Sequence, residues 1–66
     1  MKNRIRVERA ERRMTQQQLA EAVGVSRQTV NAIEAGKFIP SALLALKIAR
    51  VFEKPFEAVF QLEEGE

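Results

Sequence analysis

A glycine between two helical patterns constrains the fold of this chain most. Thr15 and Gln18 form the Thr-x-x-Gln pattern of a capping box, which predicts that a helix begins immediately after Thr15. Apolar residues then recur at helical spacing as far as Gly24, a residue type that commonly ends helices in the left-handed conformation. Ser26 is a preferred N-cap residue, so a second helix is predicted over residues 27–34. The sequence therefore predicts two short helices joined by a turn of about three residues.

Similar signals predict three further helices. Pro40 prevents the preceding helix from continuing, and Ser41 is predicted to cap a strong helix over residues 42–52. Pro55 opens a short last helical turn, and a weaker helical pattern covers residues 4–13. The apolar residues of the 42–52 helix are expected to lie mostly on one side: Leu43, Leu46, Ile48, Ala49 and Phe52.

Only the end of the chain departs from helical spacing. Residues 59–63 alternate apolar and polar side chains, which is a strand pattern. So short a strand needs a partner, which Ile5 and its neighbours could supply from the same chain or from a second copy. The predicted fold class is all-α, with five compact helices and a short C-terminal strand in a single domain of residues 1–66.

Composition excludes several classes of function. The chain has no cysteine and no histidine, so the usual ligands of zinc, haem and iron–sulfur clusters are missing, and no metal or cofactor is expected. The longest apolar run, residues 42–46, is too short to span a membrane, and no apolar segment follows Lys2 and Arg4 as in a secretory signal. No pair of carboxylates or phosphate-binding loop marks an enzyme. The predicted location is the cytoplasm, with no membrane partner.

Charge is placed unevenly along the chain. Residues 1–37 carry eight basic and four acidic residues, a net charge of +4, whereas residues 38–66 carry three basic and five acidic residues, a net charge of −2. A basic half favours a polyanionic partner, although a solvated charged surface produces the same pattern. Charge by itself therefore does not define the function.

The second helix of the opening pair has a polar outer face. Val30 and Ile33 point inward at i, i+3 spacing. The outward residues are Arg27, Gln28, Thr29, Asn31 and Ala32. Arginine pairs bidentately with guanine, and glutamine or asparagine pairs with adenine, so this set is typical of a base-reading helix. The alternative is an ordinary pair of antiparallel helices whose outer face is merely polar.

The stretch from Thr15 to Gly36 resembles the DNA-binding domain of phage repressor/Cro and Xre-type regulators. The family pattern is matched at Thr15-Gln16, Leu19-Ala20, Gly24, Ser26, Ile33-Glu34-Ala35-Gly36 and Pro40-Ser41. The resemblance implies a lambda-repressor-like fold whose helix-turn-helix occupies about residues 16–34. It also implies double-stranded DNA as the partner.

The same resemblance implies a role for individual residues. Base edges would be read by Arg27, Gln28 and Asn31, with Thr29 on the backbone or a thymine methyl group. Phosphates would be bound by Gln16, Lys37, Arg13 and the start of the helix capped by Ser41. The scaffold would depend on the turn at Gly24 and on an ion pair between Arg9 and Glu34.

Two residues depart from the family pattern. Glu8 stands where the family usually has leucine, which is expected to reduce the core contributed by the first helix. That core is then expected from Ile5, Met14 and either Val7 or Ala10. Arg13 replaces a usual glycine and adds a positive charge close to the expected path of the phosphates.

A homodimer is predicted because a core of this size is marginal and one module reads few base pairs. The candidate dimerisation segment is residues 56–63, with Val59, Phe60 and Leu62 as its apolar contacts. Phe56 is expected to close the core of the monomer, and the alternative is that Phe60 does so too.

The predicted function is that of a sequence-specific regulator of transcription, a repressor that binds a palindromic operator as a homodimer. The alternative is a protein-interaction module of the same fold, such as an antitoxin or a co-regulator. With no separate ligand domain in the sequence, no small-molecule ligand is expected.

Overall fold

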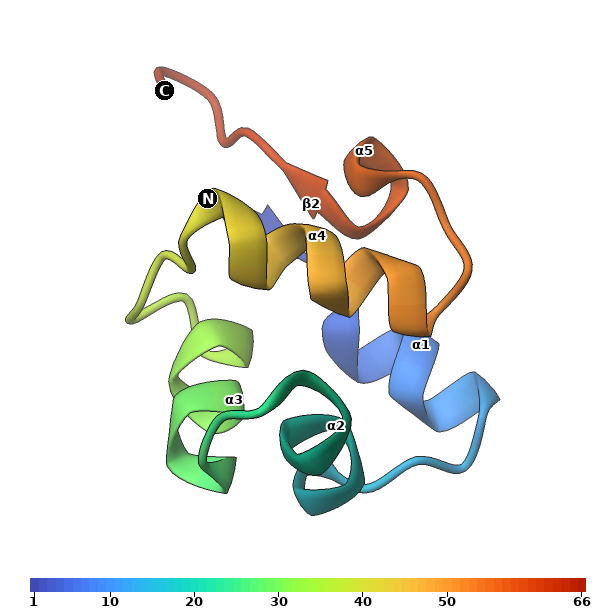
Figure 1. The fold of residues 1–66 in the computed structure, drawn as a ribbon. Coiled ribbons are helices and arrows are strands. Elements are labelled where there is room, and N and C mark those ends of the chain that lie inside the picture. The colour runs from blue at the N-terminus through green and yellow to red at the C-terminus, as the bar shows by residue number, and fades with distance from the viewer.

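The chain forms five helices, whose arrangement is drawn in Figure 1. They surround one apolar core, and a two-stranded sheet joins the two ends of the chain. The computed structural model describes all residues from 1 to 66. The elements in chain order are β1 (Lys2–Asn3), α1 (Ile5–Glu11), α2 (Gln16–Val23), α3 (Arg27–Glu34), α4 (Ala42–Val51), α5 (Phe56–Val59) and β2 (Phe60–Gln61). The predicted all-α class with a short C-terminal strand is confirmed.

Side-chain caps begin three of the helices as predicted. Thr15 Oγ1 accepts the Gln18 N–H at 3.0 Å, and Gln18 Oε1 accepts the Thr15 N–H at 2.8 Å, which completes the capping box. Ser26 and Ser41 each accept the N–H of the residue three positions later, both at 3.2 Å. These oxygens satisfy backbone donors that have no partner inside a helix, so the helix starts are defined locally.

Every helix contributes to the core. Its twelve buried apolar residues are Ile5, Leu19, Ala20, Val23, Val30, Ile33, Ala45, Ile48, Ala49, Phe52, Val59 and Phe60. Met14 and Val25 pack against this cluster as partly buried neighbours. α4 supplies Ala45, Ile48 and Ala49, and its C-cap residue Phe52 adds a fourth side chain on the same side.

The expectation that Leu43 and Leu46 share a side with Ile48, Ala49 and Phe52 was wrong. These side chains are 65% and 56% exposed, on the outer face of α4. The inner face is formed by Ala45, Ile48, Ala49 and Phe52, which are all buried. Residues 43, 46, 47 and 50 have the same helical spacing as residues 45, 48, 49 and 52, so spacing alone does not distinguish the two faces.

The expected positions of Phe56 and Phe60 were reversed. Phe60 is 2% exposed and Val59 is fully buried, so both are core residues of the monomer and not contacts for a second copy. Phe56 is 37% exposed, and its ring stacks on that of Phe60 with the centroids 5.2 Å apart. The exchange arises because α5 ends at Val59 and the chain then becomes extended, which turns Phe60 inward.

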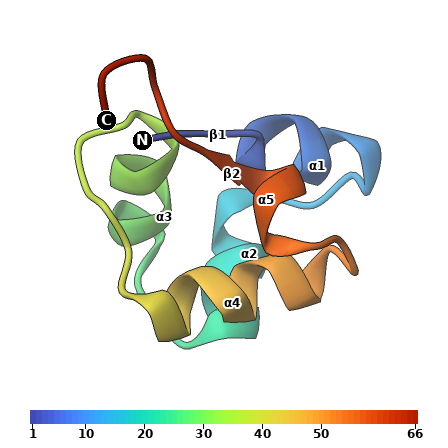
Figure 2. The same ribbon diagram turned by 90° about the horizontal axis from the view of Figure 1, so that it is seen from above.

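The partner of the C-terminal strand belongs to the same chain. β1 and β2 are antiparallel, with Lys2 opposite Gln61 and Asn3 opposite Phe60. Figure 2 shows the two strands side by side, with the two chain ends close to one another. Between the two sources expected for a partner, pairing within one chain is therefore the one observed, just before Ile5.

The first helix is shorter than predicted and ends at Glu11. Two residues later, Arg13 has a φ of 52°, a left-handed conformation that glycine adopts at low cost and other residues adopt rarely. This is the position at which the resemblance led us to expect a glycine. The backbone therefore keeps the turn, and an arginine side chain occupies it.

Glu8 is buried, so it does not leave a gap in the core. Its Oε1 lies 2.7 Å from Nη1 of Arg12, whose guanidinium also lies over the ring of Phe52, 5.1 Å from the centroid. The apolar core of α1 comes from Ile5, whereas Val7 and Ala10 are exposed, contrary to the expectation that one of them would be buried.

Candidate nucleic-acid interface

The turn between α2 and α3 has the geometry that its sequence predicts. Gly24 has φ 78° and ψ 34°, the left-handed conformation, and its N–H and that of Val25 both point to the carbonyl oxygen of Ala20. A Cβ atom at Gly24 would meet no atom within 4 Å. The need for glycine therefore comes from the backbone conformation alone and not from crowding.

α3 presents a polar face to solvent. Val30 and Ile33 bury its inner face, while Arg27, Gln28 and Asn31 are exposed. Three of the four predicted base-reading side chains are therefore on the surface together, on successive turns of one helix.

Thr29, the fourth predicted reader, is half-buried. Its hydroxyl lies 3.0 Å from that of Ser26, the residue that caps α3. The side chain of Thr29 is thus engaged with the start of its own helix.

A buried carboxylate anchors α3 to α1. Glu34 has a side chain that is only 1% exposed, and Arg9 donates from Nε to Oε2 at 2.6 Å and from Nη2 to Oε1 at 3.1 Å. The predicted Arg9–Glu34 pair is confirmed. Arg9 also donates from Nη1 to the carbonyl oxygen of Met14 at 2.8 Å, so one guanidinium ties together α1, the loop after it and α3. Such a forked, bidentate contact defines geometry as well as charge.

The charged state of Glu34 follows from its donors. Burial by itself would raise the pKa of the Glu34 carboxyl. Hydrogen bonds from Arg9 and Gln16, together with the charges of Arg9 and Arg6, outweigh burial, and the pKa lies below its ordinary value of 4.5. Glu34 is therefore a carboxylate at neutral pH.

Gln16 makes contacts that sequence reasoning missed. Its Nε2 donates to Asn31 Oδ1 at 3.1 Å and to Glu34 Oε1 at 3.2 Å. Asn31 and Glu34 are three residues apart on α3, so one side chain at the start of α2 reaches both. The sequence held a partial signal, since i, i+3 residues share a face, but the placement of α2 beside that face was not predictable from spacing.

The other predicted phosphate contacts are all exposed. Lys37 follows Gly36, which has a φ of 75°, just after the end of α3. Ser41 caps α4, and Arg13 lies in the left-handed turn after α1. Each of these residues comes at a helix end or in a turn next to one.

Asn3 is a second residue that the sequence did not point to. Its Nδ2 donates to the carbonyl oxygen of Ile33 at 2.9 Å, and its Oδ1 accepts the N–H of Ile5 at 3.1 Å. This side chain therefore bonds the first residue of α1 and a residue in the last turn of α3 at the same time. A single asparagine near a chain end carries no pattern from which this role could be predicted.

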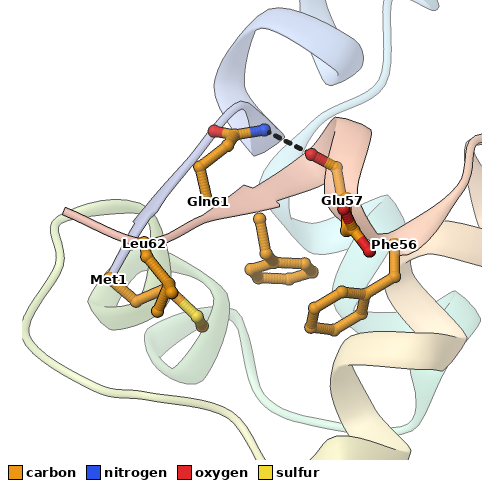
Figure 3. A pocket seen from close by; sticks show the side chains of 6 residues that line it. Met1, Phe56, Glu57, Gln61 and Leu62 are labelled. Carbon is orange, nitrogen blue, oxygen red and sulfur yellow. Dashed lines mark hydrogen bonds between the residues drawn. The ribbon is translucent and has the colours of Figure 1, made fainter. Parts of the chain in front are cut away.

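A shallow apolar depression lies between the first residue of the chain and its C-terminal segment. It has a volume of about 610 Å³ and is lined by Met1, Phe56, Glu57, Phe60, Gln61 and Leu62. Figure 3 shows Met1 and Leu62 next to each other at one side and Phe56 at the other.

None of the helices combines the length and apolar character that a membrane crossing needs.

A left-handed glycine turn between two capped helices, with a polar face on the second, defines a helix-turn-helix domain. The sequence profile of the helix-turn-helix family matches residues 5–59, which is most of the chain. The chain belongs to the Xre/Cro-type family of helix-turn-helix transcriptional regulators, and the lambda-repressor-like fold implied by the resemblance is confirmed.

Similar proteins occur in bacteria and archaea. The chain is 53% identical over 64 residues to YgzD of Bacillus subtilis, named as an uncharacterized HTH-type transcriptional regulator, with 97% of each chain covered. It is 48% identical over 66 residues to a protein of Methanocaldococcus jannaschii with the same kind of name, and both chains are covered completely. A protein of Archaeoglobus fulgidus, again so named, is 48% identical over 66 residues, covering all of this chain and 93% of its own.

Proposed function

We propose that this protein is a cytoplasmic, sequence-specific repressor that binds a palindromic operator in double-stranded DNA as a homodimer. The observation that carries this proposal is the exposed face of α3, on which Arg27, Gln28 and Asn31 stand together on a helix anchored by buried contacts. Rigid support of this kind is what direct readout needs, because base edges are distinguished by the placement of donors and acceptors.

Each part of the proposed interface has a distinct task. Arg27 and Gln28 would read base edges in the major groove, where an α-helix fits. Lys37, Arg13 and the start of α4 after Ser41 would contact phosphates and set the register of the protein on the duplex. Repression then requires only occupancy, because a dimer bound across an operator excludes other proteins from the same DNA.

The dimer is supported by two exposed apolar surfaces of opposite charge. On the outer face of α4, Leu43 and Leu46 lie with Lys47 and Arg50 around a shallow depression. At the end of the chain, Leu62 is 69% exposed and lies in the depression that Glu57 also lines.

A two-fold axis would place the basic surface of α4 against the acidic C-terminal surface of the second copy, twice per dimer. The molecule measures 32 × 21 × 20 Å, which permits two touching copies to place their α3 helices about one turn of B-DNA apart, ~34 Å. In this proposal Leu62 keeps the interface role predicted for it, and the α4 leucines join it.

Selection of bound sequences from a random duplex pool tests the proposal. The expected product is one enriched site with two inverted half-sites whose centres are about 10 base pairs apart. Enrichment of no sequence, with binding that depends only on salt, would contradict sequence-specific function. That result would favour the alternative of a protein-interaction module with the same fold.

A further inference from the structure

Four polar side chains form a continuous series of hydrogen bonds from α1 to the exposed face of α3. Arg9 donates to both carboxylate oxygens of Glu34, at 2.6 and 3.1 Å. Gln16 Nε2 donates to Glu34 Oε1 at 3.2 Å and to Asn31 Oδ1 at 3.1 Å. The series therefore begins at a buried ion pair and ends at a side chain proposed to read DNA.

The charge of Glu34 determines how the two amide groups are oriented. A carboxylate can only accept hydrogen bonds, so Gln16 must turn its NH₂ group, and not its carbonyl oxygen, toward Glu34. The same nitrogen also faces Asn31. Asn31 must therefore present its carbonyl oxygen to Gln16, because two NH₂ groups facing each other would each lack an acceptor.

This orientation leaves the amide nitrogen of Asn31 without a partner in the protein, on the exposed face of α3. In the major groove, adenine and guanine both offer the acceptor N7, whereas cytosine offers only the N4 donor. A nitrogen held toward the DNA can bond to a purine, and it meets a second donor when the base is cytosine. An asparagine that rotated freely could satisfy cytosine through its oxygen.

We infer that Glu34, acting through Gln16, is a positioning residue for base readout: it holds Asn31 with its amide nitrogen toward the DNA, so that the facing base must carry an acceptor and cytosine is rejected. The inference rests on the proposed function, since it places Asn31 opposite a base. It adds to that function the chemical rule by which one position of the operator is read.

The test begins with selection from random duplexes using the parent and Asn31→Ala, which together identify the base position that depends on Asn31. We compare duplexes that differ in the base facing Asn31 at that position. The parent is expected to bind duplexes with a purine there about 3- to 10-fold more tightly than duplexes with cytosine there, the size of one net hydrogen bond. Gln16→Ala frees the Asn31 amide to rotate and is expected to bring this ratio close to one. A parent without the preference, or a Gln16→Ala variant that keeps it, would overturn the inference.

Gln17→Ala is the matched control. Gln17 lies next to Gln16 on α2, but its Nε2 donates to Glu21 at 3.1 Å and not to α3, so this variant should keep the parent's ratio. A second readout needs no DNA: NMR relaxation of the Asn31 side-chain amide should report order in the parent and in Gln17→Ala, and mobility in Gln16→Ala. Equal order in all three overturns the inference. Failure of the parent to select any duplex overturns the proposed function instead, and the NMR result still decides the inference.

Discussion

At the scale of single residues, Glu34 concentrates the electrostatics of this small domain. A buried carboxylate would be costly alone, but Arg9 forms two hydrogen bonds to that of Glu34 and Gln16 forms a third. The same contacts orient the side chains around it. We therefore expect both stability and readout to depend on this one titratable group.

The stability of the protein should depend on pH through Glu34. Its folded-state pKa is lowered below 4.5, so the carboxylate contributes stability above that value, and the contribution is lost as pH falls through the lowered pKa. Urea unfolding should show Glu34→Gln less stable than the parent at pH 7, with the difference shrinking steadily below pH 4.5. Glu11→Gln, at an exposed residue without an ion pair, is the control and should show no such trend. A Glu34→Gln deficit that is the same at pH 7 and in acid would contradict this account.

Base reading and phosphate binding should separate at Gln28 and Lys37. Gln28→Ala is expected to cost about 1–3 kcal/mol on the selected operator and little on random DNA, because a base contact carries sequence information. Lys37→Ala should weaken binding to all sequences alike and flatten the salt dependence by about one unit of slope. Titrations of both variants at several salt concentrations measure these effects. Equal losses for Gln28→Ala on both kinds of DNA would move this residue to the backbone.

At the scale of elements, helix ends in this chain use the left-handed conformation repeatedly. Gly24 adopts it after α2, but Arg13 after α1 and Glu53 after α4 adopt it with φ angles of 52° and 56°. Residues with a Cβ resist this conformation by about 1–2 kcal/mol. Two of the turns therefore hold side chains at an energetic cost, and only the one near the expected phosphate path holds a cation.

Arg13→Gly is expected to stabilise the fold by about 0.5–1 kcal/mol, the relief of strain less the added flexibility of glycine in the unfolded chain. If Arg13 contacts a phosphate, the same variant should weaken DNA binding and lower the salt slope by about one unit. Glu53→Gly should give a similar gain in stability without any loss of positive charge. Thermal unfolding and salt titrations compare the two variants, and unchanged DNA binding by Arg13→Gly would show that its charge is idle.

Sequence reasoning was strongest where a signal is local. Caps at Thr15, Ser26 and Ser41 and the glycine at position 24 define helix ends through contacts within a few residues, and all were predicted. The inner and outer faces of α4 were not predicted correctly. The residues of both faces have the same helical spacing, and the outer face begins with two leucines. The contact of Gln16 with Asn31 was missed for a related reason, since it depends on how two helices are placed relative to each other.

At the scale of the whole molecule, two solvent-exposed regions each combine apolar side chains with charge of one sign. Lys47 and Arg50 border the exposed leucines of α4, whereas Glu57 borders the depression that contains Leu62. In a monomer both surfaces would remain uncovered. A symmetric dimer can cover both at once and match their charges.

Charge reversal tests this dimer. Sedimentation at micromolar concentration should give a dimer for the parent and mostly monomer for the double variant Lys47→Glu/Arg50→Glu, because like charges would then meet across the axis. Adding Glu57→Lys to that variant should restore association, because opposite charges would again face each other. Lys54→Glu, outside both surfaces, serves as the control. A parent that sediments as a monomer would contradict the proposed dimer, and full association of the double variant would locate the interface elsewhere.

The pairing of β1 with β2 has a consequence for folding during synthesis of the chain. Residues 2 and 3 can pair only after residues 60 and 61 have been made. The core is incomplete until Val59 and Phe60 are also in place. Until residues 59 to 61 have left the ribosome, the helix-turn-helix segment lacks the last side chains against which the core closes. The domain should therefore reach its final fold only after residue 61 has left the exit tunnel, so that a growing chain cannot yet hold α3 in its DNA-reading position.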